Sequence, residues 1–120
     1  METTRESRFV LLSSPLMHEL GGELCKHLEK SGMHIPQYRI EFTVFANGEV
    51  LPRIPHTIRG QHVLFLHALQ HPDPNTAVMM MLIANDDIKR ASASGITLVT
   101  PYLPYMRQDR KDQPRVPISA

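Results

Sequence analysis

The chain has 120 residues, 42% of them hydrophobic, which is enough apolar material for one compact domain and too little for two. Its formal net charge of +1 excludes a broad cationic surface, so any affinity for phosphate groups must come from a local cluster of basic side chains. The single cysteine, Cys25, excludes an internal disulfide, no apolar run reaches the roughly 20 residues of a membrane span, and the first eight residues, METTRESR, lack the apolar stretch of a signal peptide. We therefore expect a cytoplasmic protein without a membrane segment.

Apolar runs alternate with segments of helical periodicity, which predicts an α/β fold with a mostly parallel sheet flanked by helices. RFVLL (residues 8–12) is expected to form a buried strand. Ser14 and Pro15 then provide an N-cap and an N1 proline for a helix that Gly32 ends. Leucines recur every four residues along this helix, at Leu16, Leu20, Leu24 and Leu28. The internal glycines at positions 21 and 22 each cost about 1 kcal/mol relative to alanine, so packing must stabilise the helix.

The segment YRIEFTVF (residues 38–45) alternates between apolar and polar side chains, which predicts one strand with Tyr38, Ile40, Phe42 and Val44 on the same face. Phe45 falls on the polar face. Ala46-Asn47-Gly48 is typical of a tight hairpin turn, after which residues 49–51 begin a return strand that prolines confine to an edge.

HVLFLHA (residues 62–68) is the kind of continuous apolar strand that is buried on both faces. Asp73 and Pro74 then repeat the combination of cap and proline at the start of a second helix, which we expect to end at Gly95. One face of this helix is apolar, at Ala77, Met81, Ala84, Ile88 and Ala91. GITLVT (residues 95–100) is the next buried strand. The loop that follows leaves its carboxyl end, where ligands gather in open α/β sheets.

This loop contains the one local cluster of basic residues, RQDRKDQPR (residues 107–115). A guanidinium can stack on a purine and donate two parallel hydrogen bonds to a phosphate, while a nearby carboxylate and amide can recognise the amino edge of a base. The succession of Arg, Gln and Asp is therefore suited to a nucleotide. The alternatives are a solvated charged loop and a basic arm for nucleic acid. The second is disfavoured because Asp109 and Asp112 interrupt the positive run.

Phe45 at the hairpin is a candidate stacking platform for a base, with Asn47 and Glu49 beside it to supply hydrogen bonds. The alternatives are an isolated exposed apolar residue and ordinary turn chemistry. His67 and His71 have a spacing that suits zinc on a helix, but in a strand such residues are roughly 13 Å apart and cannot share one ion. The segment Met79-Met80-Met81 is interpreted as core packing. No glycine-rich phosphate loop or metalloprotease motif is present.

Four segments, FANGE, TIRG, KRASASGITLV and PYLPYMRQDRKDQPRVPISA, together resemble the amino-terminal half of ribose-phosphate pyrophosphokinase, the phosphoribosyl pyrophosphate synthetase family. The similarity runs from about Phe9 to Ala120. It implies a type I phosphoribosyltransferase-like fold with two related α/β domains, of which residues 1–120 would be most of the first. It also implies transfer of the diphosphoryl group of ATP to the 1-hydroxyl of ribose 5-phosphate, with Mg²⁺, to give phosphoribosyl pyrophosphate (PRPP) and AMP.

The resemblance also implies roles for individual residues. The ATP-binding set would be Phe45, Asn47, Glu49, Arg107, Gln108, Asp109, Arg110 and Asp112. Phe45 of a neighbouring subunit would stack on adenine, Arg107 would cover the opposite face, and Arg110 would act at the phosphates as the catalytic residue. Thr57, Arg59 and Arg115 match positions near a regulatory phosphate or ADP site. No metal ligand is expected within the chain.

Two features of the sequence differ from the full pattern of the family. Residues 75–82 are NTAVMMML, where many family members have the more polar N-D-N-L-M-E-L-L, so polar contacts of that region are not expected here. The magnesium ligands, the catalytic loop and the ribose-phosphate loop of the family would lie beyond Ala120, so we expect the chain alone to be inactive. The alternative is a non-catalytic regulatory or associated subunit of the same family. Either version predicts a homo-oligomer, from dimer to hexamer, without nucleic acid or membrane partners.

Overall fold

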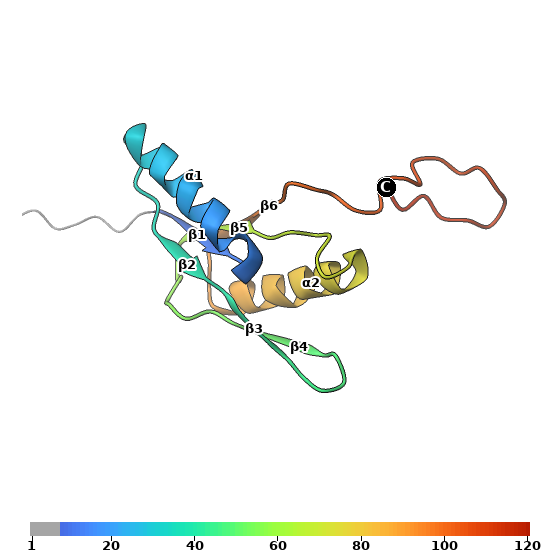
Figure 1. The fold of residues 1–120 in the computed structure, drawn as a ribbon, viewed down its shortest axis with the longest axis horizontal. Helices are drawn as coiled ribbons and strands as arrows, with labels where there is room; N and C mark the ends of the chain where they lie inside the picture. Colours follow the sequence, from blue (N-terminus) through green and yellow to red (C-terminus); the bar gives the residue numbers. More distant parts are fainter. Residues whose placement is uncertain (1–7) are drawn as a thin grey trace, which may run out of the picture.

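The structure, a computed structural model, describes residues 8–120, and the expectation about a signal sequence falls almost entirely on residues 1–7, outside the described part. A parallel sheet of four strands lies at its centre, in the order β2-β1-β5-β6. These strands are β1 (Phe9–Ser13), β2 (Gln37–Arg39), β5 (His62–Leu66) and β6 (Gly95–Val99). An antiparallel hairpin of β3 (Glu41–Val44) and β4 (Val50–Arg53) lies beside it (Figure 1). The predicted α/β fold with a mostly parallel sheet and a hairpin is confirmed.

Two helices, α1 (His18–Lys30) and α2 (Pro74–Arg90), cover opposite faces of the sheet (Figure 1). Alternate residues of β1 therefore enter different cores. Val10 packs in the core under α2 with Phe65 and Ile88, whereas Leu11 packs in the core under α1 with Leu66. Both faces of the central strands are buried, which is why their sequences are continuous apolar runs. Neither helix within residues 8–120 is long and apolar enough to cross a bilayer.

The region around α1 confirms the predicted end of the helix and confirms Ser14 and Pro15 as its start only in part. Ser14 has an extended backbone, but its side chain makes no capping hydrogen bond, and the chain first forms a 3-10 turn, η1 (Pro15–Met17). The leucine stripe does not face the core, because the helix turns Gly21 toward the sheet. Of the four leucines, Leu16, Leu20 and Leu24 are exposed and Leu28 packs against the core. Gly32 follows the helix with φ of +86°, as expected of a residue that ends it.

The prediction of one strand over residues 38–45 is wrong. Tyr38 pairs with β1 in the parallel sheet, whereas Phe42 pairs with Pro52 in the hairpin. The chain changes partner at Ile40, whose N–H donates to the Ser13 carbonyl at 2.9 Å and whose side chain is fully buried. Sequence periodicity cannot reveal this change of pairing partner, because apolar and polar residues continue to alternate on both sides of Ile40. Val44, which the alternation places on the same face as Ile40, is exposed near the tip of the hairpin, and the hairpin contacts α2 through β4.

The start of α2 agrees with the prediction. Asp73 has an extended backbone, and its carboxylate accepts hydrogen bonds from the Thr76 N–H at 2.9 Å and the Thr76 hydroxyl at 2.8 Å. The predicted apolar face is buried, with Ala77, Ala84 and Ile88 inaccessible and Met81 and Ala91 packed against them.

The predicted end of α2 is wrong. The helix ends at Arg90, and Ser92 takes the left-handed conformation with φ of +66°. Gly95 instead opens β6, where it lies against the His62 ring: a Cβ there would be 2.7 Å from His62 Nδ1. The glycine is needed for close approach between neighbouring strands and has no part in ending the helix.

Candidate functional site

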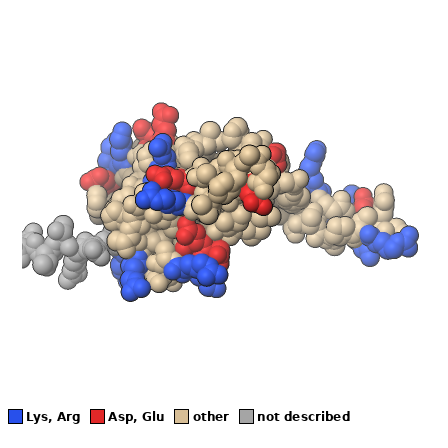
Figure 2. Space-filling model, turned by 90° about the horizontal axis from the view of Figure 1, so that it is seen from below, with Lys and Arg blue, Asp and Glu red and all other residues tan. Residues whose placement is uncertain are grey.

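The candidate site lies at the carboxyl edge of the sheet, where β1, β5 and β6 end. The tip of the hairpin, the first turn of α2 and the segment of residues 101–120 all lie at this end of the molecule (Figure 1). Figure 2 shows that the projecting terminal segment bears both basic and acidic side chains, while much of the adjoining surface is uncharged. The hairpin and the charged loop, the two regions that the sequence singled out, therefore both lie toward the carboxyl end of the sheet (Figure 1).

Residues 101–120 contain no helix or strand and fold back on themselves. The Ser119 hydroxyl donates to the Tyr105 carbonyl at 3.3 Å, and the Ala120 N–H donates to the Gln108 carbonyl at 3.1 Å. The Gln108 side-chain amide donates to the Arg110 carbonyl and, at 3.3 Å, to an Asp112 carboxylate oxygen. Gln108 and Asp112, both predicted site residues, therefore hold each other in place.

A cleft of about 460 Å³ separates this segment from the start of α2, and we call it the loop cleft. It is lined by Asp73, Pro74, Asn75, Tyr102, Pro104, Tyr105, Arg107, Gln108 and Ser119. The hydrogen bonds from Thr76 lower the pKa of the Asp73 carboxyl, so it is ionised at neutral pH. Asp73 and Arg107 form no ion pair among the residues from 8 to 120. The loop cleft thus contains the Asp73 carboxylate and the Arg107 guanidinium, which do not pair with each other.

A second cleft, of about 730 Å³, lies between the hairpin and α2, and we call it the hairpin cleft. Phe45 and Glu49 line it together with Met79 and other residues of both elements. Phe45 is 47% exposed, so its ring is not part of the core. Asn47 does not line this cleft; its side-chain oxygen accepts the Glu49 N–H at 3.1 Å, which is turn chemistry. Asn75 lines both clefts, so the two are neighbours.

The remaining predicted residues lie apart from these clefts. Asp109 and Arg110 are exposed on the terminal segment and line neither the loop cleft nor the hairpin cleft. Thr57 and Arg59 are exposed ahead of β5, at the amino edge of the sheet, whereas Arg115 lies on the terminal segment beyond the carboxyl edge. Within one chain these three residues are not brought together.

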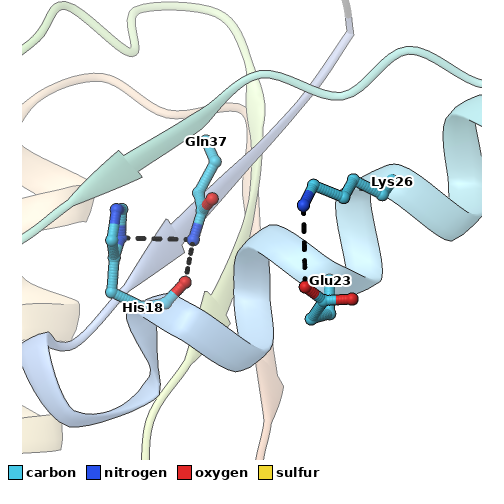
Figure 3. A network of polar contacts seen from close by, with 4 residues as sticks. All are labelled: His18, Glu23, Lys26 and Gln37. Carbon is cyan, nitrogen blue, oxygen red and sulfur yellow. Dashed lines mark hydrogen bonds and ion pairs between the residues drawn. The ribbon is translucent and has the colours of Figure 1, made fainter.

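Two polar groups at the carboxyl edge lie outside the predicted set of site residues. Ser13 Oγ lies 2.9 Å from His18 Nδ1, and Gln37 Nε2 donates to Ser13 Oγ at 3.1 Å and to the His18 carbonyl at 2.8 Å. Figure 3 shows Gln37 reaching from its strand to the first turn of α1. This network fastens α1 to β1 and β2. The nearby pair of Glu23 and Lys26, 3.6 Å apart, is exposed and contributes little to stability.

The second group is His67, directly after β5, which lines a mostly apolar cleft of about 280 Å³ with Ser14, Phe42 and His71 among others. Its Nε2–H donates to the Ala77 carbonyl at 2.9 Å, and its Nδ1 has no hydrogen-bond partner in the described part of the chain. Burial lowers the pKa of this imidazole. No group of three His, Cys, Asp or Glu side chains within residues 8–120 is arranged to hold a metal ion.

Comparison with known proteins points to one family. The family described as the N-terminal domain of ribose phosphate pyrophosphokinase matches residues 9–120. A ribose-phosphate pyrophosphokinase of Mycoplasmopsis pulmonis is 37% identical over 115 residues, which cover 96% of this chain and 34% of that protein. A ribose-phosphate pyrophosphokinase of Aquifex aeolicus is 46% identical over 78 residues, 65% of this chain and 25% of that protein. The chain spans about one third or less of the length of these curated relatives.

Comparison with solved structures leads to the same family. The phosphoribosylpyrophosphate synthetase from Mycobacterium smegmatis superposes with a TM-score of 0.77 and 32% identity, covering 95% of this chain and 36% of that one. The hypoxanthine-guanine phosphoribosyl transferase of L. donovani superposes with a TM-score of 0.65 at 11% identity, covering 78% of this chain and 53% of that one, a likeness of fold alone. The expected type I phosphoribosyltransferase-like fold is confirmed.

Proposed function

The chain belongs to the family of the N-terminal domain of ribose-phosphate pyrophosphokinase, and on that premise we propose that residues 1–120 are the ATP-binding part of a ribose-phosphate diphosphokinase. In the reaction, the 1-hydroxyl oxygen of ribose 5-phosphate attacks the β-phosphorus of ATP and loses its proton. The bond between that phosphorus and the oxygen of the α-phosphate breaks, so that AMP leaves and PRPP forms. We place this activity in the cytoplasm.

One observation carries the proposal: Arg107 and Gln108 line a cleft at the carboxyl edge of the sheet, and Phe45 is exposed at the hairpin on the same edge. A guanidinium and an aromatic ring can cover the two faces of a purine. Phe45 and Arg107 line different clefts, which suits an arrangement in which the hairpin of a second copy closes on the loop cleft of the first. The site then requires at least a dimer, and larger assemblies up to a hexamer satisfy the same condition.

The other predicted residues are assigned by their positions. Asn47 and Glu49 would accompany Phe45 at the base, and Gln108, Asp109 and Asp112 would contact the adenosine. Arg110 is the proposed catalytic residue, because an exposed guanidinium beyond the base can neutralise the charge that develops on the transferred group. Loss of one such donor typically raises the barrier by about 3 kcal/mol. Mg²⁺ would supply further charge neutralisation, and no step is assigned to a metal held by residues 8–120.

The proposed regulatory site would use residues that lie far apart in one chain. Thr57 and Arg59 lie at one edge of the sheet and Arg115 lies beyond the other, so a regulatory phosphate or ADP site that uses all three would combine two copies of the chain. The ribose 5-phosphate site and the magnesium ligands are proposed to lie outside these residues. On this proposal the 120-residue chain binds ATP without forming PRPP, which is also the behaviour of a non-catalytic subunit of the family.

The test is calorimetric titration of the chain with ATP. Arg107→Ala and Phe45→Ala should each weaken binding, and the double variant should abolish measurable heat. Arg8→Ala serves as the matched control, because Arg8 is exposed at the amino edge of the sheet, away from both clefts. ATP affinity that is the same in the double variant and in Arg8→Ala would refute the assignment of the site.

A further inference from the structure

We propose that Asp73 selects the base of the bound nucleotide by accepting a hydrogen bond from an exocyclic amino group, so that the loop cleft prefers a 6-aminopurine to a 6-oxopurine. This inference rests on the proposed function, because it assumes that the loop cleft binds a purine nucleotide. It adds a residue of α2 to a site otherwise built from the hairpin and the terminal segment.

The first step is that Asp73 has a fixed position and spare hydrogen-bonding capacity. As the N-cap of α2, its two carboxylate oxygens accept from the N–H and the hydroxyl of Thr76, at 2.9 and 2.8 Å. Those bonds orient the carboxylate and hold it ionised, and each oxygen keeps a further lone pair. A ligand that brings an N–H donor into the loop cleft therefore meets a preoriented acceptor.

The second step is that the phosphates of the nucleotide do not bind at the side of the loop cleft formed by the start of α2. The N-terminus of a helix ordinarily attracts anions through its free N–H groups. Here Pro74 has no N–H, the Thr76 N–H is already bonded to Asp73, and Asp73 adds a negative charge. A phosphate would be repelled from this end of the loop cleft. The base must face Asp73, and the phosphates must point toward the basic side chains of the terminal segment.

The third step is that the opposite wall matches a base. Arg107 and Gln108 lie there with Tyr102 and Tyr105, whose rings are about half exposed. The Gln108 amide donates to Asp112, which does not itself line the loop cleft. Of the described residues that line the loop cleft, Asp73 is the one with a carboxylate, and no described cation pairs with it.

These steps lead to selectivity. Adenine offers its 6-amino group to the carboxylate while Arg107 covers the ring. Hypoxanthine differs at that position by an oxo group, an acceptor that would face another acceptor. A site that is arranged to hydrogen-bond a donor disfavours an analogue that presents an acceptor there, because the Asp73 carboxylate and the 6-oxo group would repel each other.

The experiment compares ATP with ITP, which differ at the 6-position, by calorimetric titration of the 120-residue chain. The wild type should bind ATP at least about tenfold more tightly than ITP. Asp73→Ser removes the carboxylate but leaves an N-cap residue, so α2 should persist, as a circular dichroism spectrum would show. Its ATP affinity should fall toward that of ITP, while the ITP affinity stays the same or rises.

Asp73→Asn provides a second variant that also preserves the cap. Its amide can donate to the 6-oxo group, so the preference should narrow further or reverse. Asp86→Asn, an exposed carboxylate near the other end of α2, is the control and should leave the preference unchanged. If ATP and ITP both bind but their ratio is the same in the wild type and both Asp73 variants, this inference is overturned and the proposed function stands. If neither nucleotide binds the wild type, both are overturned.

Discussion

The side-chain amide of Gln37 occupies the space that a side chain at Gly21 would need. A Cβ on Gly21 would lie 2.5 Å from Gln37 Nε2, 3.2 Å from Leu11 Cδ2 and 3.3 Å from Leu66 Cδ2. The same Nε2 donates to the carbonyl of His18, in the first turn of α1. The glycine that weakens α1 as an isolated helix is therefore what allows the helix to approach β1 and β2 so closely.

Gly21→Ala should destabilise the protein. Alanine gains up to about 1 kcal/mol of helix propensity, but the methyl group must displace Gln37 from its hydrogen bonds and press on two leucines, and overpacking of this kind costs about 1–3 kcal/mol. We expect a net loss of about 1 kcal/mol in the free energy of unfolding, measured by urea denaturation.

Gly22→Ala is the matched control for this prediction. A Cβ at position 22 would meet Gln37 Oε1 at 3.5 Å, an ordinary van der Waals distance. The propensity gain should then dominate, and stability should rise by about 0.5–1 kcal/mol. Equal effects of the two substitutions would show that α1 does not pack on the sheet through Gly21.

Ile88→Ala should be strongly destabilising, because Ile88 is fully buried in the core between α2 and the sheet. Truncating such a side chain costs about 2–5 kcal/mol. Leu82→Ala, on the same helix but 52% exposed, should change the free energy of unfolding by less than about 0.5 kcal/mol. Similar losses in thermal or urea denaturation for the two variants would mean that α2 presents a different face to the sheet.

The free energy of unfolding should fall as the pH drops below about 6.5. Burial lowers the pKa of His67, and the hydrogen bond to Ala77 opposes this shift only in part, so the imidazole stays neutral in the folded chain while it takes up a proton in the unfolded chain. The unfolded state then binds more protons, and stability decreases from the unfolded pKa down to the folded one. The slope attributable to this residue is at most about 1.4 kcal/mol per pH unit.

His67→Gln isolates this contribution, because glutamine can still donate to the Ala77 carbonyl but does not titrate near neutral pH. The variant should have a flatter dependence of unfolding free energy on pH between 7 and 5. His71→Gln is the control, since His71 is exposed, and it should keep the wild-type slope. A slope that survives in His67→Gln would assign the pH dependence to other groups.

Gly48→Ala should loosen the tip of the hairpin. Gly48 has φ of +89°, a conformation that costs an L-residue about 1–2 kcal/mol. Its N–H donates to the Phe45 carbonyl at 2.9 Å, and the Phe45 N–H donates to the Glu49 carbonyl at 2.8 Å. Amide hydrogen exchange at both positions should accelerate, while exchange in β1 and β5 stays slow. Unchanged exchange at Phe45 would indicate a turn that tolerates alanine.

The sequence was sufficient for the elements whose signals are local. Continuous apolar runs predicted the strands β1, β5 and β6, because strands with two covered faces are rich in apolar residues. The expectation that residues 95–100 are buried is wrong for β6: it is the edge strand of the sheet, its residues are at most partly buried, and Thr97 is exposed. Asp73 with Pro74, and Gly48 in the hairpin turn, specified local backbone conformations that the structure confirms. The family was recognisable for the same reason, because its motifs are contiguous strings of residues.

Only the tertiary structure determined the features that depend on contacts between residues distant in the chain. The alternating segment from 38 to 45 splits at Ile40, because the Ile40 N–H donates to the Ser13 carbonyl and the residues after it pair with β4. Both partners are distant in the sequence, so the local pattern does not indicate them. The leucine stripe of α1 faces outward because Gly21 fits against Gln37 and a leucine there would not. Asp73 and Arg107 line the same cleft only because the terminal segment passes the start of α2. Periodicity describes one element at a time, whereas packing selects which of its faces meets a neighbour.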